Sequence, residues 1–143
     1  MTAHWSTSYV GLPWAAVGRD RSGVDCWGLI RLVYAEQLRI LLPSYLGAYS
    51  SESERGELAA HIDGVAASGI WTEIGRADVL PFDVLVFRRG RLDTHVGLVV
   101  ERGLMLHVAE REQSKIETFA QGRWQHRLSG VYRHLETPSR GAR

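Results

Sequence analysis

Residues 23–29 read Gly23-Val24-Asp25-Cys26-Trp27-Gly28-Leu29 and contain the only cysteine of this 143-residue chain. After this stretch, apolar residues recur at intervals of three and four positions, which predicts a helix from Cys26 to about Arg39 with Asp25 as its N-cap. The positive end of a helix dipole favours the thiolate, which is the nucleophilic form of cysteine. Residues 19–23 predict an exposed loop before the helix, so we expect substrate to reach Cys26. The alternative, a small buried core cysteine, stays open at this point.

The composition predicts one globular domain. The chain has 45% hydrophobic and 23% charged residues with a net charge of +1, and its basic residues are scattered, so we expect no nucleic-acid partner. Residues 1–9 lack a basic start and an apolar run, which predicts neither a secretory signal nor membrane insertion. We expect a folded domain over residues 1–135 and a disordered tail over residues 136–143, where Pro138 and Gly141 lie.

The order of the predicted elements is helices first and strands later. An aromatic segment over residues 5–14 is expected to pack on the helix that begins at Cys26, and a capping box of Ser51 and Glu54 predicts a second helix. Strands are then expected over six ranges, which are 70–74, 84–87, 95–101, 104–109, 114–119 and 130–135. This order predicts an α+β fold with N-terminal helices packed on an antiparallel β-sheet.

Two histidines fall on one predicted hairpin, over residues 95–109. Matching the apolar faces of its two strands requires a three-residue loop, in which Gly103 supplies a positive φ. The same register places His95 and His107 together on the other face, beside Gly97, which leaves space for a third group.

A thiol and two histidines allow two chemistries. In the first, His95 takes the proton of Cys26 while His107 hydrogen-bonds the far nitrogen of His95 and fixes its tautomer. In the second, these three residues bind zinc together with Asp25 or Asp93. Structural zinc sites usually have closely spaced pairs of ligands, which this sequence lacks, so we expect no metal and no cofactor.

Several motifs resemble, in order, the NlpC-like cell-wall cysteine peptidases. They are Asp25-Cys26-Trp27-Gly28-Leu29, Leu80-Pro81-Phe82-Asp83-Val84-Leu85-Val86-Phe87, His95-Val96-Gly97-Leu98 and Met105-Leu106-His107-Val108. Trp14 and three motifs resemble the branch found in phage and prophage tail-assembly clusters; the motifs are Asp25-Cys26-Trp27-Gly28-Leu29-Ile30, Leu42-Pro43-Ser44-Tyr45 and Gly130-Val131-Tyr132-Arg133-His134. The resemblance implies a papain-like core.

The resemblance also implies roles for individual residues. Cys26 corresponds to the nucleophile, His95 to the general base and His107 to the residue that orients it. Asp25 falls where relatives contact the amino group of the substrate. Trp14 stands where many relatives carry a tyrosine, so only an indole N–H is available there to help hold the oxyanion.

Two further departures from the family pattern concern the shape of the site. Trp27 replaces a small residue after the cysteine, which is expected to narrow or reshape the substrate cleft. Phe82 occupies a position where glycine is frequent, so we expect a local change in the turn.

The function implied by the resemblance is a phage tail-associated peptidoglycan hydrolase. Such an endopeptidase cleaves a stem-peptide amide, often between D-glutamate and diaminopimelate, by acyl transfer through Cys26. Its expected partners are the stem peptide and other tail-tip proteins; it would be made in the host cytoplasm, carried at the virion tail tip and act on the bacterial cell wall. The alternatives are a non-catalytic tail-tip component and an interbacterial cell-wall amidase effector.

Overall fold

The structure is a computed structural model that describes residues 4–43, 69–90 and 92–137. The second helix predicted after Ser51 and residues 138–143 of the predicted tail lie outside the described residues. Within the tail as predicted, Glu136 and Thr137 are described, and Thr137 is buried. No helix of the described part combines the length and the apolarity that crossing a membrane requires.

The main helix begins where the sequence predicts. The Asp25 carboxylate accepts a hydrogen bond of 2.7 Å from the N–H of Gly28, which caps helix α1 (Cys26–Val33). The helix continues as a π-helical turn, η2 (Tyr34–Leu38), and ends at Arg39, which adopts a left-handed conformation with φ of 58°. The predicted cap and the predicted end near Arg39 are therefore confirmed.

The N-terminal segment contributes two small elements. A 3-10 helix, η1 (Trp5–Tyr9), buries Tyr9, and the predicted exposed loop is instead a two-stranded hairpin of β1 (Arg19–Asp20) and β2 (Gly23–Val24). The turn residues 20–22 are exposed as predicted, whereas Val24 of the second strand is fully buried in the apolar cluster that it shares with α1. A short 3-10 helix, η3 (Arg76–Asp78), lies later in the chain.

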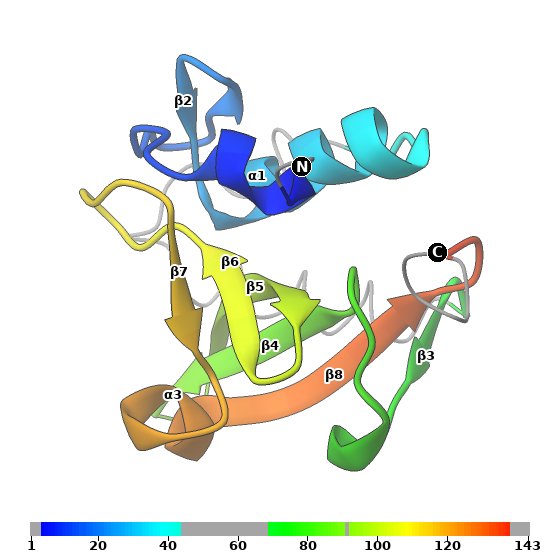
Figure 1. Cartoon of the computed structure of the whole chain (residues 1–143). Coiled ribbons are helices and arrows are strands. Elements are labelled where there is room, and N and C mark those ends of the chain that lie inside the picture. Colours follow the sequence, from blue (N-terminus) through cyan, green and yellow to red (C-terminus); the bar gives the residue numbers. More distant parts are fainter. Residues whose placement is uncertain (1–3, 44–68, 91, 138–143) are drawn as a thin grey trace.

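All six predicted strands are present and form one antiparallel sheet in the order β3-β8-β4-β5-β6-β7 (Figure 1). Their bounds are Trp71–Glu73 for β3, Val84–Arg89 for β4, Leu92–Glu101 for β5, Leu104–His107 for β6, Lys115–Thr118 for β7 and Leu128–His134 for β8. The α+β class is confirmed.

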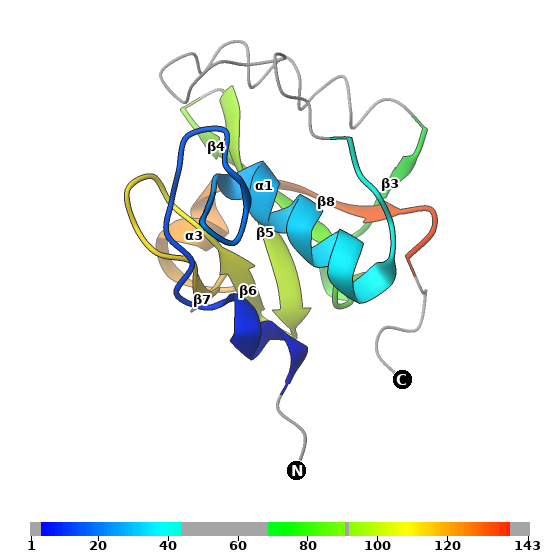
Figure 2. The ribbon, with the colours of Figure 1, turned by 90° about the horizontal axis from the view of Figure 1, so that it is seen from above.

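The two faces of the sheet carry different helices. Alternate residues of β5, such as Val96 and Leu98, join the apolar cluster of α1, which crosses above the sheet in Figures 1 and 2. The other alternate residues of β5, such as Val99, face a second apolar cluster, which contains Trp124 of helix α3 (Gly122–Arg127). The sequence does not predict α3. The sheet is thus covered on both faces.

The turn of the β5–β6 hairpin differs from the prediction. Glu101 pairs with Leu104 across a two-residue turn, so the predicted three-residue loop is wrong. A register shift between Val99 and Glu101 brings Leu98 opposite Leu106 and restores the match of apolar faces. Gly103 has the predicted positive φ, 76°.

Candidate active site

Cys26 is the first residue of α1, at the end of the helix where backbone N–H groups point outward. Its side chain is buried with 4% exposure, so the expectation that it is reached from an exposed loop is not met in this conformation. It belongs to the same apolar cluster as Val96, the neighbour of His95, and α1 packs against β5. The fold therefore places the thiol on the helix that packs on the strand of His95.

The Asp25 carboxylate is already engaged inside the protein. One oxygen accepts hydrogen bonds from the N–H of Gly28 and from the guanidinium of Arg19, each at 2.7 Å, and Asp25 is 1% exposed. Its role as a cap is observed, whereas contact with a substrate amino group stays a prediction.

The two tryptophans predicted to contact substrate lie on either side of Cys26 in the sequence. The indole N–H of Trp27 donates a 2.9 Å hydrogen bond to the carbonyl of Pro43, which ties the start of α1 to the segment after η2. Trp14 forms an isolated β-bridge with Val24, and its buried indole N–H has no hydrogen-bond partner among the described residues.

The two histidines meet as predicted. Nε2 of His95 lies 2.9 Å from Nδ1 of His107, and both side chains are buried. Gly97 lies beside the pair as predicted; a Cβ there would lie 3.5 Å from Cβ of His107, which is an ordinary contact, and 2.9 Å from Sδ of Met105, which would have to shift. The hydrogen bond leaves Nδ1 of His95 as the nitrogen that can take a proton from a thiol.

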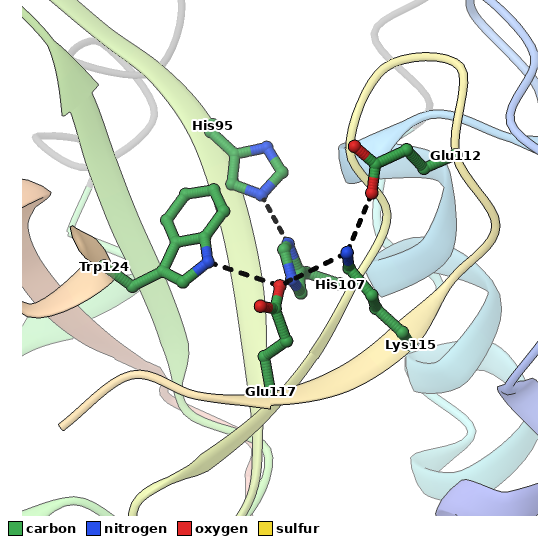
Figure 3. A network of polar contacts seen from close by, with 6 residues as sticks. All are labelled: His95, His107, Glu112, Lys115, Glu117 and Trp124. Carbon is green, nitrogen blue, oxygen red and sulfur yellow. Dashed lines mark hydrogen bonds and ion pairs between the residues drawn. The ribbon is translucent and has the colours of Figure 1, made fainter. Parts of the chain in front are cut away.

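Two residues of this network are absent from the sequence prediction. Oε1 of Glu117 lies 2.6 Å from Nε2 of His107, and the indole of Trp124 stacks on the ring of His95 with centroids 5.2 Å apart (Figure 3). Glu117 lies on the same face of the sheet as His107, two positions after its pairing partner Lys115. Extending the alternation to the third strand would have found Glu117.

Burial and nearby charge keep both imidazoles neutral at neutral pH. Burial lowers the pKa of His95 well below its ordinary 6.5, and the neighbouring His107 and then the positive charges of Arg127 and Arg123 lower it further. Burial also lowers the pKa of His107, although the hydrogen bond to Glu117 opposes this. Burial raises the pKa of Glu117, but His107, Lys115 and the indole N–H of Trp124 together outweigh it, and the net pKa of this carboxyl is lowered.

Zinc is the alternative chemistry for Cys26, His95 and His107 together with Asp25 or Asp93. Among the side chains described, in residues 4–43, 69–90 and 94–137, no group of three or more His, Cys, Asp or Glu is arranged to hold a metal ion. The structure brings His95 and His107 into hydrogen-bond contact, and their role in acid–base chemistry stays a prediction.

Comparison with known proteins identifies the family. The profile of the NlpC/P60 family matches residues 11–133, which is most of the chain. The chain belongs to the NlpC/P60 family. Members of this family are cysteine peptidases or peptidoglycan hydrolases. Comparison with curated proteins gave no significant match.

Solved NlpC/P60 structures share the papain-like α+β fold. A protein of Staphylococcus aureus described as similar to lipoprotein of the NLP/P60 family has 22% identity and a TM-score of 0.63 over 90% of this chain. An NlpC/P60 family protein of Bacillus cereus has 19% identity and a TM-score of 0.66 over 91% of this chain. This chain spans 38% of the length of each.

A third NlpC/P60 structure is similar in length to this chain. It is the NlpC/p60 domain of the peptidoglycan hydrolase SagA, with 19% identity, a TM-score of 0.60, and coverage of 88% of this chain and 90% of that domain. The domain compared there is therefore close in extent to the whole of this chain.

Proposed function

We propose that this protein is a cysteine endopeptidase that cleaves an amide bond in peptidoglycan stem peptides. The observation that carries the proposal is the pair of His95 and His107, hydrogen-bonded at 2.9 Å, with His95 on the strand that packs against the helix beginning with Cys26, in a chain of the NlpC/P60 family. The bond between D-glutamate and diaminopimelate is the proposed target, on the basis of the motifs around Cys26 and His95.

The proposed reaction is acyl transfer. Nδ1 of His95 takes the proton of the Cys26 thiol, and the sulfur attacks the amide carbonyl carbon to form a C–S bond. Backbone N–H groups at the start of α1 stabilise the oxyanion. His95 then gives its proton to the leaving amine as the C–N bond breaks, and water hydrolyses the thioester to release the acyl product and the thiol.

We further propose that the protein works with a phage or prophage tail. The support is the resemblance of Trp14 and of the stretches 42–45 and 130–134 to the tail-assembly branch. The protein would be made in the host cytoplasm, carried at the virion tail tip beside other tail-tip proteins, and brought by them to the cell wall.

Digestion of purified diaminopimelate-type peptidoglycan tests the enzymatic proposal. We expect new stem-peptide termini, identified by mass spectrometry, with the wild type and a complete loss with Cys26→Ala, because the sequence contains no other thiol. His126→Ala, at an exposed histidine, is the control and should retain activity. Full activity of Cys26→Ala would refute the mechanism.

A non-catalytic tail-tip role is the second candidate, because Cys26 is buried. A thiol-reactive probe distinguishes the two functions, since an activated cysteine labels rapidly near neutral pH whereas an inert buried cysteine labels slowly. Slow labelling of a folded protein that cleaves neither diaminopimelate-type nor lysine-type walls would favour the binding role.

A further inference from the structure

The hydrogen-bond chain does not end at the two histidines but continues to β7. Oε1 of Glu117 accepts hydrogen bonds from Nε2 of His107 at 2.6 Å and from the indole N–H of Trp124 at 3.3 Å (Figure 3). The same Trp124 ring stacks on His95. Glu117 therefore contacts one histidine directly and holds the ring that covers the other.

An ionised carboxylate only accepts hydrogen bonds, and this fixes where the protons lie. Nε2 of His107 must carry a hydrogen to donate to Glu117, so the neutral ring of His107 has an acceptor at Nδ1. That acceptor can be satisfied only if Nε2 of His95 carries the hydrogen. Nδ1 of His95 is then left without a proton and is basic.

We propose that Glu117 is a positioning residue that sets the tautomers of both histidines and so keeps Nδ1 of His95 ready to take the thiol proton. This inference rests on the proposed function, in which His95 is the general base. Glu117 contacts neither the substrate nor Cys26 in this scheme and acts through His107.

The charges around Glu117 are consistent with this role. Nζ of Lys115 lies 2.8 Å from Glu112 and 3.7 Å from Oε1 of Glu117, so its closer ion pair is the one with Glu112. On the other side, Arg123 and Arg127 of α3 lie over the ring of Trp124, at 5.0 and 4.7 Å from its centroid. The strongest contact of Glu117 is the one to His107.

The isosteric variant Glu117→Gln provides the sharpest test. Its amide can donate to His107 as well as accept from it, so we expect some His95 rings to carry the hydrogen at Nδ1. The tautomers are read from the ring nitrogen chemical shifts of 15N-labelled histidine by NMR. General acid–base catalysis contributes about 10²–10⁴-fold in total, so we expect a kcat lower by roughly 10- to 100-fold with little change in KM.

Glu101→Gln is the control because it changes an exposed glutamate at the end of β5 that is far along the strand from His95. This control should keep both tautomers and kcat, and Glu117→Ala should shift the tautomers further than Glu117→Gln does. Unchanged tautomers in a folded Glu117→Gln protein would overturn the inference, whatever its activity. A tautomer shift in a protein whose wild type cleaves no peptidoglycan would support the role of Glu117 and refute the proposed function instead.

Discussion

The environment of His95 predicts the pH at which activity is lost. A general base works only when it is unprotonated, so kcat/KM should fall as the pH drops through the pKa of His95, which burial and the charges of Arg127 and Arg123 hold well below 6.5. Removing either positive charge makes protonation of His95 easier and so raises its pKa. We therefore expect Arg127→Gln and Arg123→Gln to move the acidic limb of the pH profile to higher pH.

The control for this prediction is Arg102→Gln, which removes a positive charge at the turn after the far end of β5. It should leave the acidic limb where it is in the wild type. A limb that stays in place in the two α3 variants would show that the arginines do not act on the base.

At the scale of residues, the sequence predicts what local chemistry dictates. The Asp25 cap follows from its place before an apolar helical repeat, and the meeting of His95 and His107 follows from strand alternation. Trp124 could not be found this way, because α3 has only six residues and Gln121 gives it no side-chain cap. Its position over His95 is set by tertiary packing.

At the scale of elements, Phe82 holds the turn before β4 in an unfavourable conformation. Its φ is 74°, a value that bulky residues rarely adopt, at a position where the resembling family often has glycine. The ring stacks on Trp5 with centroids 4.6 Å apart, and the carbonyl accepts a 2.6 Å hydrogen bond from the hydroxyl of Tyr34. The ring of Trp5 and the hydroxyl of Tyr34 therefore hold Phe82 in this conformation.

This conformation predicts an unusual order of stability. Removing a buried phenylalanine ring costs about 3–5 kcal/mol, so both Phe82→Ala and Phe82→Gly should be less stable than the wild type. Glycine also relieves roughly 1–2 kcal/mol of left-handed strain that alanine keeps. We expect Phe82→Gly to be the more stable of the two in urea unfolding, by about 1 kcal/mol.

The matched pair at Phe119 should show the opposite order, because Phe119 is also buried but has no positive φ. There, glycine should be less stable than alanine, as a result of its greater freedom in the unfolded chain. The same order at both positions would show that Phe82 is not strained.

The β5–β6 hairpin shows why element details escape sequence analysis. A three-residue loop and a two-residue turn with a register shift at Val100 both bring Leu98 and Leu106 to one face. Apolar matching therefore predicts which side chains meet but not how the backbone accomplishes it.

At the scale of the whole molecule, the α+β order follows from the change of apolar period along the chain. The burial of both sheet faces is less visible in the sequence, because the second face is closed by the short α3 and by side chains such as Phe87 and Leu128. From the sequence alone, Phe87 and Leu128 cannot be distinguished from other apolar strand residues, so the face that they cover cannot be predicted.

Buried histidines on both sides of this sheet predict a loss of stability in mild acid. The pKa values of His95, His107 and His134 are all lowered from the ordinary 6.5, chiefly by burial. Below about pH 6.5 the unfolded chain therefore binds more protons than the folded protein, so the free energy of unfolding falls with falling pH. Above about pH 7 this effect is absent.

Urea unfolding at pH 7.5, 6.5 and 5.5 measures this dependence, and we expect the midpoint to decrease at each step. His134→Gln removes one of the three groups away from the candidate site and should make the decrease shallower, whereas His126→Gln, at an exposed position, should leave it unchanged. A midpoint that is constant from pH 7.5 to 5.5 would mean that the buried histidines are protonated at no cost. The proposal that His95 is a neutral base would then lose its support. It depends on the same burial that lowers the pKa of His95 and that should destabilise the folded protein in acid.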